Sequence, residues 1–168
     1  GFGLGNNFLA TWAAWRDDAE RCERLHFVSL ENHPLTRDDL ARALVNSPFT
    51  QLAQELVAAW PPLTPNLHRL TFESGRVQLL LGLGDAPTLA RQLVARVDAF
   101  YLDGFAPARN EAMWSPPLFN SLARLAATDA TAATNAKTTP ATVHQNIARC
   151  SPRSFLLSSI IHSCASSC

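Results

Sequence analysis

The chain opens on glycines at three alternate positions, Gly1, Gly3 and Gly5. Such a run lets a strand turn sharply into a helix and lets the backbone approach a ligand where no side chain stands in the way. Taken alone, the run is a weak signal and is more typical of a plain structural turn. The dinucleotide-binding pattern would have a further glycine where this chain has Asn6, and that difference disfavours a nicotinamide cofactor.

Three single carboxylates, Glu31, Asp85 and Asp103, each follow a predicted strand. In a parallel sheet the carboxyl ends of the strands form the ligand-binding edge, so these acids are expected beside the glycine turn. Glu31 follows Gly5 at about the spacing of an acid that accepts hydrogen bonds from ribose hydroxyls. For Asp85 two interpretations stay open, namely an acceptor for an adenine amino group and a cap for the helix that opens near Thr88.

The segment 103–114 is the most distinctive local feature. It contains an acid after an apolar strand, together with Phe105, Asn110 and Trp114. A packed connecting loop would explain the two aromatic residues. Loops at this edge of a parallel sheet are also where function usually lies.

Strands and helices alternate along the chain, which predicts an α/β fold with a mainly parallel sheet. The helix predictions cover residues 7–15, 36–44, 49–60, 88–94 and 116–126, and the strand predictions cover residues 25–30, 67–72, 77–83 and 99–102. The two strands at 67–72 and 77–83 read as a hairpin.

Composition separates the chain near residue 134. All 14 acidic residues lie at or before Asp129, whereas Lys137, Arg149 and Arg153 follow without any acid. The formal charge is +0, which gives no overall signature of nucleic-acid binding. No apolar run is long enough to cross a membrane, and neither the histidines nor the cysteines have metal-ligand spacing. We therefore expect no membrane association and no metal.

Four stretches together resemble the methyltransferase domain of the bifunctional tRNA 5-methylaminomethyl-2-thiouridine biosynthesis proteins, the MnmC family. They are GFGLGNNFLATW, LHFVSLENHPLTRDDLA, HRLTFESGRVQLLLGLGDA and VDAFYLDGFAPARNEAMWSPPLFNSLARLA. The last stretch is the most specific to the family. The resemblance implies a Rossmann-like S-adenosylmethionine-dependent methyltransferase, with Gly1, Gly3 and Gly5 around the methionine part, Glu31 on the ribose and Asp85 facing the adenine.

The implied reaction is methylation of the 5-aminomethyl group of a modified wobble uridine in cytoplasmic tRNA. Asp103 would lie nearest the reacting methyl group, and Phe105, Asn110 and Trp114 would bind the base. The alternatives are a related methyltransferase for another amine or small molecule, and a non-catalytic nucleotide-binding remnant. Bifunctional family members also carry an FAD-dependent oxidoreductase domain, to which nothing in this sequence corresponds.

The resemblance ends near Thr134. We therefore expect residues 1–134 to form a partial methyltransferase domain with an incomplete sheet, lacking the strand before Gly1. Residues 135–168 are expected to be an unrelated tail, either frameshifted or disordered. The family usually has Thr and Leu where this chain has Leu4 and Asn6, so a hydroxyl contact near the cofactor is expected to be lost.

Overall fold

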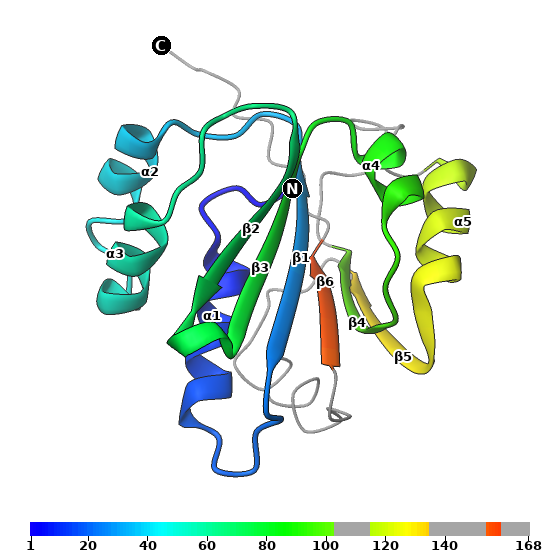
Figure 1. Ribbon diagram of the computed structural model, residues 1–168, viewed down its shortest axis with the longest axis horizontal. Coiled ribbons are helices and arrows are strands. Elements are labelled where there is room, and N and C mark those ends of the chain that lie inside the picture. The colour runs from blue at the N-terminus through cyan, green and yellow to red at the C-terminus, as the bar shows by residue number, and fades with distance from the viewer. Residues whose placement is uncertain (103–114, 135–153, 159–168) are drawn as a thin grey trace.

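A six-stranded sheet forms the centre of the computed structural model, which describes residues 1–102, 115–134 and 154–158. The strand order is β2-β3-β1-β6-β4-β5 (Figure 1). All neighbours run parallel except β2 and β3, which form the predicted antiparallel hairpin. The strands are β1 (Leu25–Glu31), β2 (Asn66–Phe72), β3 (Val77–Leu83), β4 (Val97–Leu102), β5 (Ala126–Thr134) and β6 (Ser154–Ser158).

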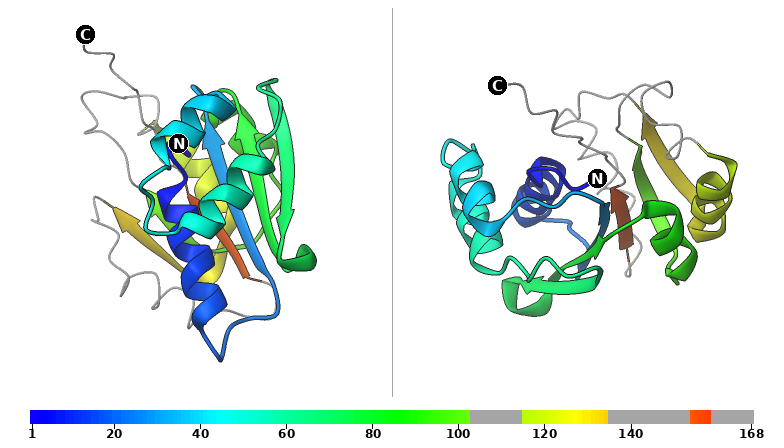
Figure 2. Two further views of the ribbon diagram at one scale, coloured as in Figure 1. Left: turned by 90° about the vertical axis from the view of Figure 1, so that its left-hand side faces the viewer. Right: turned by 90° about the horizontal axis from the view of Figure 1, so that it is seen from above.

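Helices cover the sheet from both sides (Figure 2). One layer consists of α1, α2 and α3, and the opposite layer consists of α4 and α5. The helices are α1 (Asn6–Asp17), α2 (Arg37–Ala43), α3 (Thr50–Ala58), α4 (Ala86–Gln92) and α5 (Pro116–Leu125), and a short 3-10 turn, η1 (Glu73–Gly75), joins β2 to β3. The predicted α/β class with a mainly parallel sheet is confirmed.

β1 has buried side chains on both of its faces, so the sheet needs a layer of helices on each side. Leu25 and Phe27 point into the core beneath α1, whereas Val28 and Leu30 belong to the core beneath α4 and α5. All four side chains are almost fully buried. A parallel strand buried on both faces is a largely apolar run rather than a strictly alternating one. Residues 25–30, Leu-His-Phe-Val-Ser-Leu, have this character.

Two helix starts follow from capping side chains. The Thr36 hydroxyl accepts a hydrogen bond of 3.1 Å from the amide of Asp39, which confirms the predicted start of α2. The carboxylate of Asp85 accepts one of 2.9 Å from the amide of Thr88. That bond makes Asp85 the cap residue, so α4 begins at Ala86, two residues before the predicted start at Thr88.

β6 comes from the part of the chain that the sequence assigned to a separate tail. It pairs with β1 on one side and with β4 on the other, so the described sheet is continuous across its centre. The boundary near residue 134 and the origin of the tail stay predictions.

Candidate functional site

The predicted binding edge forms where β1 and β3 end and α1 begins. Glu31 and Leu83 are the last residues of the two strands and are paired in register. The chain enters α1 from the glycine turn, and Gly3 contacts the end of β1. Two of the predicted acids and the glycine turn therefore meet at one edge, as the strand ends of a parallel sheet require.

The glycine turn uses backbone angles that other residues rarely adopt. Gly3 has φ 56° and Gly5 has φ 75°. The amide of Gly5 donates to the carbonyl of Phe2 at 2.9 Å, and the carbonyl of Gly5 accepts the first helical hydrogen bond of α1, from Leu9, at 2.8 Å. Glycine adopts such angles without steric cost, so the sequence folds into a tight turn directly before the helix.

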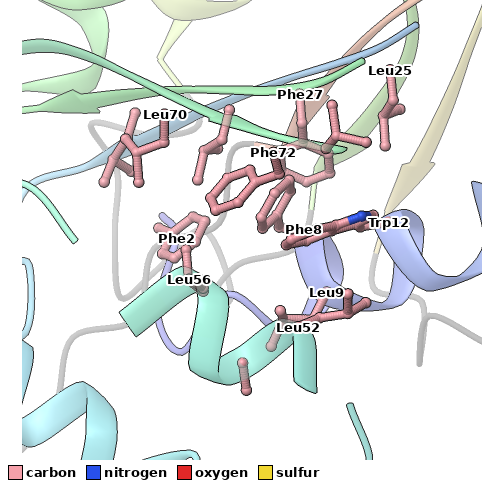
Figure 3. Close-up of a cluster of buried hydrophobic side chains, with 14 of the residues drawn as sticks. Phe2, Phe8, Leu9, Trp12, Leu25, Phe27, Leu52, Leu56, Leu70 and Phe72 are labelled. Carbon is pink, nitrogen blue, oxygen red and sulfur yellow. The ribbon is translucent and has the colours of Figure 1, made fainter. Parts of the chain in front are cut away.

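Phe2 anchors this turn in the core (Figure 3). Its ring is 6% exposed and lies 5.4 Å from the ring of Trp60 and 6.3 Å from that of Phe8, measured between centroids. A Cβ atom on Gly5 would lie 2.7 Å from two atoms of the Phe2 ring. The ring and the turn are therefore packed too closely to admit a side chain at position 5.

The carboxylate of Glu31 holds the glycine turn in place. The side chain is 3% exposed. Its Oε2 accepts a hydrogen bond from the amide of Gly3 at 3.0 Å, and its Oε1 accepts one from the amide of His33 at 2.8 Å. A carboxylate oxygen has two lone pairs, so each oxygen can accept one further hydrogen bond. The group can therefore position the turn and bind a pair of hydroxyls at the same time.

The main chain of Glu31 fixes the second acid-bearing turn. The carbonyl of Glu31 accepts a hydrogen bond of 2.8 Å from the amide of Gly84, whose φ of 138° lies in the region that favours glycine. Asp85 follows and is exposed. Its hydrogen bonds with Thr88, through side chain and backbone, hold the pKa of the carboxyl below its usual range. Asp85 is therefore a charged hydrogen-bond acceptor on the exposed turn between β3 and α4. Its predicted role as the cap of α4 is confirmed.

The structure brings together Gly3, Gly5, Glu31 and Asp85 from the predicted set, with Gly1 buried at the start of the turn. The remaining predicted residues, Asp103, Phe105, Asn110 and Trp114, lie outside the described residues.

Two contributors to the site, Gly84 and His33, were not predicted from the sequence. Gly84 had a usable signal, a glycine between a strand and a capping Asp. His33 had none, because it contributes its backbone amide, which almost every residue possesses.

Neither a metal cluster nor a spanning helix is found in the described ranges. No group of three or more His, Cys, Asp or Glu side chains there could hold a metal ion. Among the same residues, no helix has both the length and the apolar character needed to cross a membrane.

Residues 47–151 match the family model of the S-adenosyl-L-methionine-dependent methyltransferases. The chain belongs to this family. Its cofactor is therefore S-adenosylmethionine, and the residues at the edge suit it, because an adenosyl group offers a ribose diol to a carboxylate and an amino group to a second acceptor.

Curated relatives of this methyltransferase are longer proteins. One from Methylibium petroleiphilum is 67% identical over 134 residues, which is 80% of this chain and 20% of the relative. One from Burkholderia vietnamiensis is 62% identical over 138 residues, with 80% of this chain and 21% of the relative covered. Both are named tRNA 5-methylaminomethyl-2-thiouridine biosynthesis bifunctional protein MnmC. The chain spans about a fifth of the length of the curated relatives it matches.

Proposed function

We propose that this domain transfers the methyl group of S-adenosylmethionine to the 5-aminomethyl group of a modified wobble uridine in tRNA. The substrate is taken from the name shared by the relatives. The observation that carries the cofactor half of the proposal is the buried carboxylate of Glu31, bonded to the amide of Gly3. The reaction would take place in the cytoplasm, and it would be one of the two activities that the word bifunctional describes in the relatives.

Different residues at the edge bind different parts of the cofactor. Each carboxylate oxygen of Glu31 accepts one hydrogen bond from a backbone amide, of Gly3 or of His33. The remaining lone pairs accept hydrogen bonds from the ribose hydroxyls. Asp85 accepts the adenine amino group from its exposed position at the start of α4. Gly1, Gly3 and Gly5 leave room for the methionine part, because no side chain projects from these positions.

S-adenosylmethionine supplies an electrophilic methyl carbon on a sulfonium. The attacking amine of the uridine has to be neutral and aligned with that carbon, so positioning and removal of one proton are the tasks left to the protein. We assign the proton to the carboxylate of Asp103, which directly follows β4. Phe105, Asn110 and Trp114 in the same segment would enclose the base.

Two measurements test this function. Calorimetric titration of the chain with S-adenosylmethionine should give one site per chain, and Glu31→Gln should weaken binding at least about tenfold, as the loss of one charged hydrogen bond predicts. The second measurement is transfer of a labelled methyl group from S-adenosylmethionine to tRNA that carries an unmethylated 5-aminomethyl uridine, and we expect the unmodified chain to catalyse it. Asp103→Ala should abolish this transfer, whereas its binding of the cofactor should persist. Binding without any transfer to this tRNA would reject the substrate, and no binding would reject the function altogether.

A further inference from the structure

Helix α4 ends without a glycine to close it. The helix is seven residues long, and its C-cap residue, Leu93, has an extended backbone with φ −69° and ψ 139°. The last carbonyl groups of an α-helix have no partners within the helix, and a glycine after the helix commonly closes it with backbone hydrogen bonds. The residues after Gln92 are Leu93 and Val94. Partners for the last carbonyls of α4 therefore have to come from another element.

The guanidinium of Arg124, in the last turn of α5, supplies these partners. Its Nη1 donates to the carbonyl of Leu93 at 3.0 Å. Its Nη2 donates to the carbonyls of Ala90 at 3.0 Å and of Arg91 at 3.3 Å. A guanidinium presents its donors in a planar fork, so one side chain can cap several carbonyls. Its charge also lies at the end of the helix where the backbone dipole favours a cation.

A helix as short as α4 depends on such contacts along its whole length. An isolated helix of two turns is unstable in water, because it forms too few hydrogen bonds to offset the cost of the first turn. The side chains of Ala86, Leu89 and Ala90 bury one face of α4, and α5 lies beside it in the same layer (Figures 1 and 2). Loss of the cap from Arg124 should therefore loosen both ends of α4.

A line of hydrogen bonds also leads from Arg124 to the other end of α4. Arg91, whose carbonyl accepts from Arg124, donates from its own Nη2 to the hydroxyl of Thr88 at 3.2 Å. The amide of Thr88 donates to Oδ2 of Asp85 at 2.9 Å. The capping guanidinium and the carboxylate at the cofactor edge are thus connected through Arg91 and Thr88.

We propose that Arg124 is a positioning residue for the adenine end of the cofactor site, and that it acts through α4 on the carboxylate of Asp85. The inference rests on the proposed function, in which Asp85 accepts a hydrogen bond from the adenine amino group. Hydrogen bonds weaken steeply when donor and acceptor are misaligned, so an exposed carboxylate is selective only while it is held in place. Arg124 should therefore determine how well the site distinguishes adenine from a base without the amino group.

Hydrogen exchange tests the structural step without any ligand. The amide of Leu89 donates to the carbonyl of Asp85 at 3.0 Å, so it reports on the cofactor end of α4. In Arg124→Gln this amide should exchange at least about tenfold faster than in the unmodified chain, whereas the amide of Leu79, in a strand with a neighbour on each side, should keep its rate. An unchanged rate at Leu89 would overturn the proposal.

Two further variants accompany this measurement. Arg124→Lys preserves the charge but not the planar fork, so its rate at Leu89 should lie between those of Arg124→Gln and the unmodified chain. Arg96→Gln is the matched control, because Arg96 is exposed and lies after α4, in the connection to β4. The control should leave the rate at Leu89 unchanged. An equal acceleration in Arg96→Gln would overturn the proposal, because loss of any nearby charge would then have the same effect.

Two ligands measure the effect on the site. S-adenosylhomocysteine carries the adenine amino group, and S-inosylhomocysteine carries in its place a carbonyl oxygen, which cannot donate to a carboxylate. By calorimetric titration the unmodified chain should prefer the adenosyl compound at least about tenfold, and Arg124→Gln should reduce this preference at least about threefold. A general loss of folded protein would weaken both ligands equally and leave their ratio unchanged. An unchanged ratio in Arg124→Gln would therefore overturn the proposal.

Combination with Asp85→Ala decides whether the effect passes through Asp85. Asp85→Ala alone should remove most of the preference for the adenosyl compound, and Arg124→Gln added to it should not change the ratio further. An equal reduction by Arg124→Gln with and without Asp85 would overturn the proposal. If the unmodified chain binds neither compound, the proposed function fails, while exchange at Leu89 still decides whether Arg124 positions the turn at Asp85.

Discussion

The amide of Gly3 donates a 3.0 Å hydrogen bond to Oε2 of Glu31, 28 positions further along the chain. The bond joins the turn before α1 to the carboxyl end of β1. Since the carbonyl of Glu31 also accepts from the amide of Gly84, one residue fixes two turns of the candidate site. The position of Glu31 therefore determines the shape of the candidate site.

Replacing Glu31 with Gln should affect both folding and binding. The side-chain oxygen of Gln can accept one of the two amide bonds, but its NH₂ group would face the other amide, donor against donor. Leaving a buried donor without a partner costs about 1–3 kcal/mol. We expect the free energy of unfolding, measured with urea, to fall by that amount.

Glu20→Gln is the matched control, because the Glu20 side chain is exposed. It should leave the urea midpoint unchanged. If Glu31→Gln is as stable as the control but binds cofactor weakly, the carboxylate serves the ligand alone and its role in holding the glycine turn is refuted.

Gly5→Ala should destabilise the fold through two separable effects. A φ of 75° is unfavourable for alanine, at about 1–2 kcal/mol. The added Cβ would also lie 2.7 Å from the ring of Phe2, and overpacking of this kind adds about 1–3 kcal/mol.

Gly75 separates these two effects. Its φ is 86°, and a Cβ there would meet nothing within 4 Å. Gly75→Ala should therefore show the backbone cost alone, and the difference in urea midpoint between the two variants measures the packing around Phe2. Equal losses in the two variants would mean that the Phe2 ring moves aside freely.

Three substitutions of Asp85 separate its capping role from its proposed role in cofactor binding. Asp85→Ala should lower the free energy of unfolding by about 1 kcal/mol, because the hydrogen bond to the Thr88 amide is lost. Asp85→Asn and Asp85→Ser preserve a capping oxygen and should be close to the unmodified chain in stability. Ser does not reach as far as Asp, so titration with S-adenosylmethionine should show weaker binding by Asp85→Ser. If Ser and Asn bind the cofactor as tightly as Asp does, the adenine assignment fails.

The sequence predicted the parts of this structure that rest on side-chain chemistry. Recognisable sequence patterns predict the largely apolar strand β1, the cap at Thr36 and the position of Glu31 after a strand. The bonds from Gly3 and His33 to Glu31 have no such pattern, because backbone donors look alike in every sequence. β6 was missed for a related reason, since three apolar residues between serines carry too little periodicity to assign.

His26 gives the structure a pH dependence of its own. The side chain is half-buried on β1, and burial lowers its pKa below the ordinary value of 6.5, with further lowering by the positive charges of Arg24 and Arg69. The unfolded chain then binds a proton more readily than the folded chain does. The stability contributed by the neutral ring is fully present above pH 6.5 and is lost as the pH falls through the folded pKa.

Urea unfolding between about pH 5 and pH 7.5 measures this dependence. His26→Gln should flatten the curve in the window below pH 6.5, because the titrating ring is gone. Arg69→Gln preserves the ring but removes one of the positive charges that lower the pKa of His26. The pKa of His26 in the folded chain should therefore rise toward 6.5, and the pH range over which stability changes should become narrower at its acid end. An unchanged slope in His26→Gln would show that another group produces the pH dependence. A wider window in Arg69→Gln would contradict the electrostatic coupling between β1 and β2.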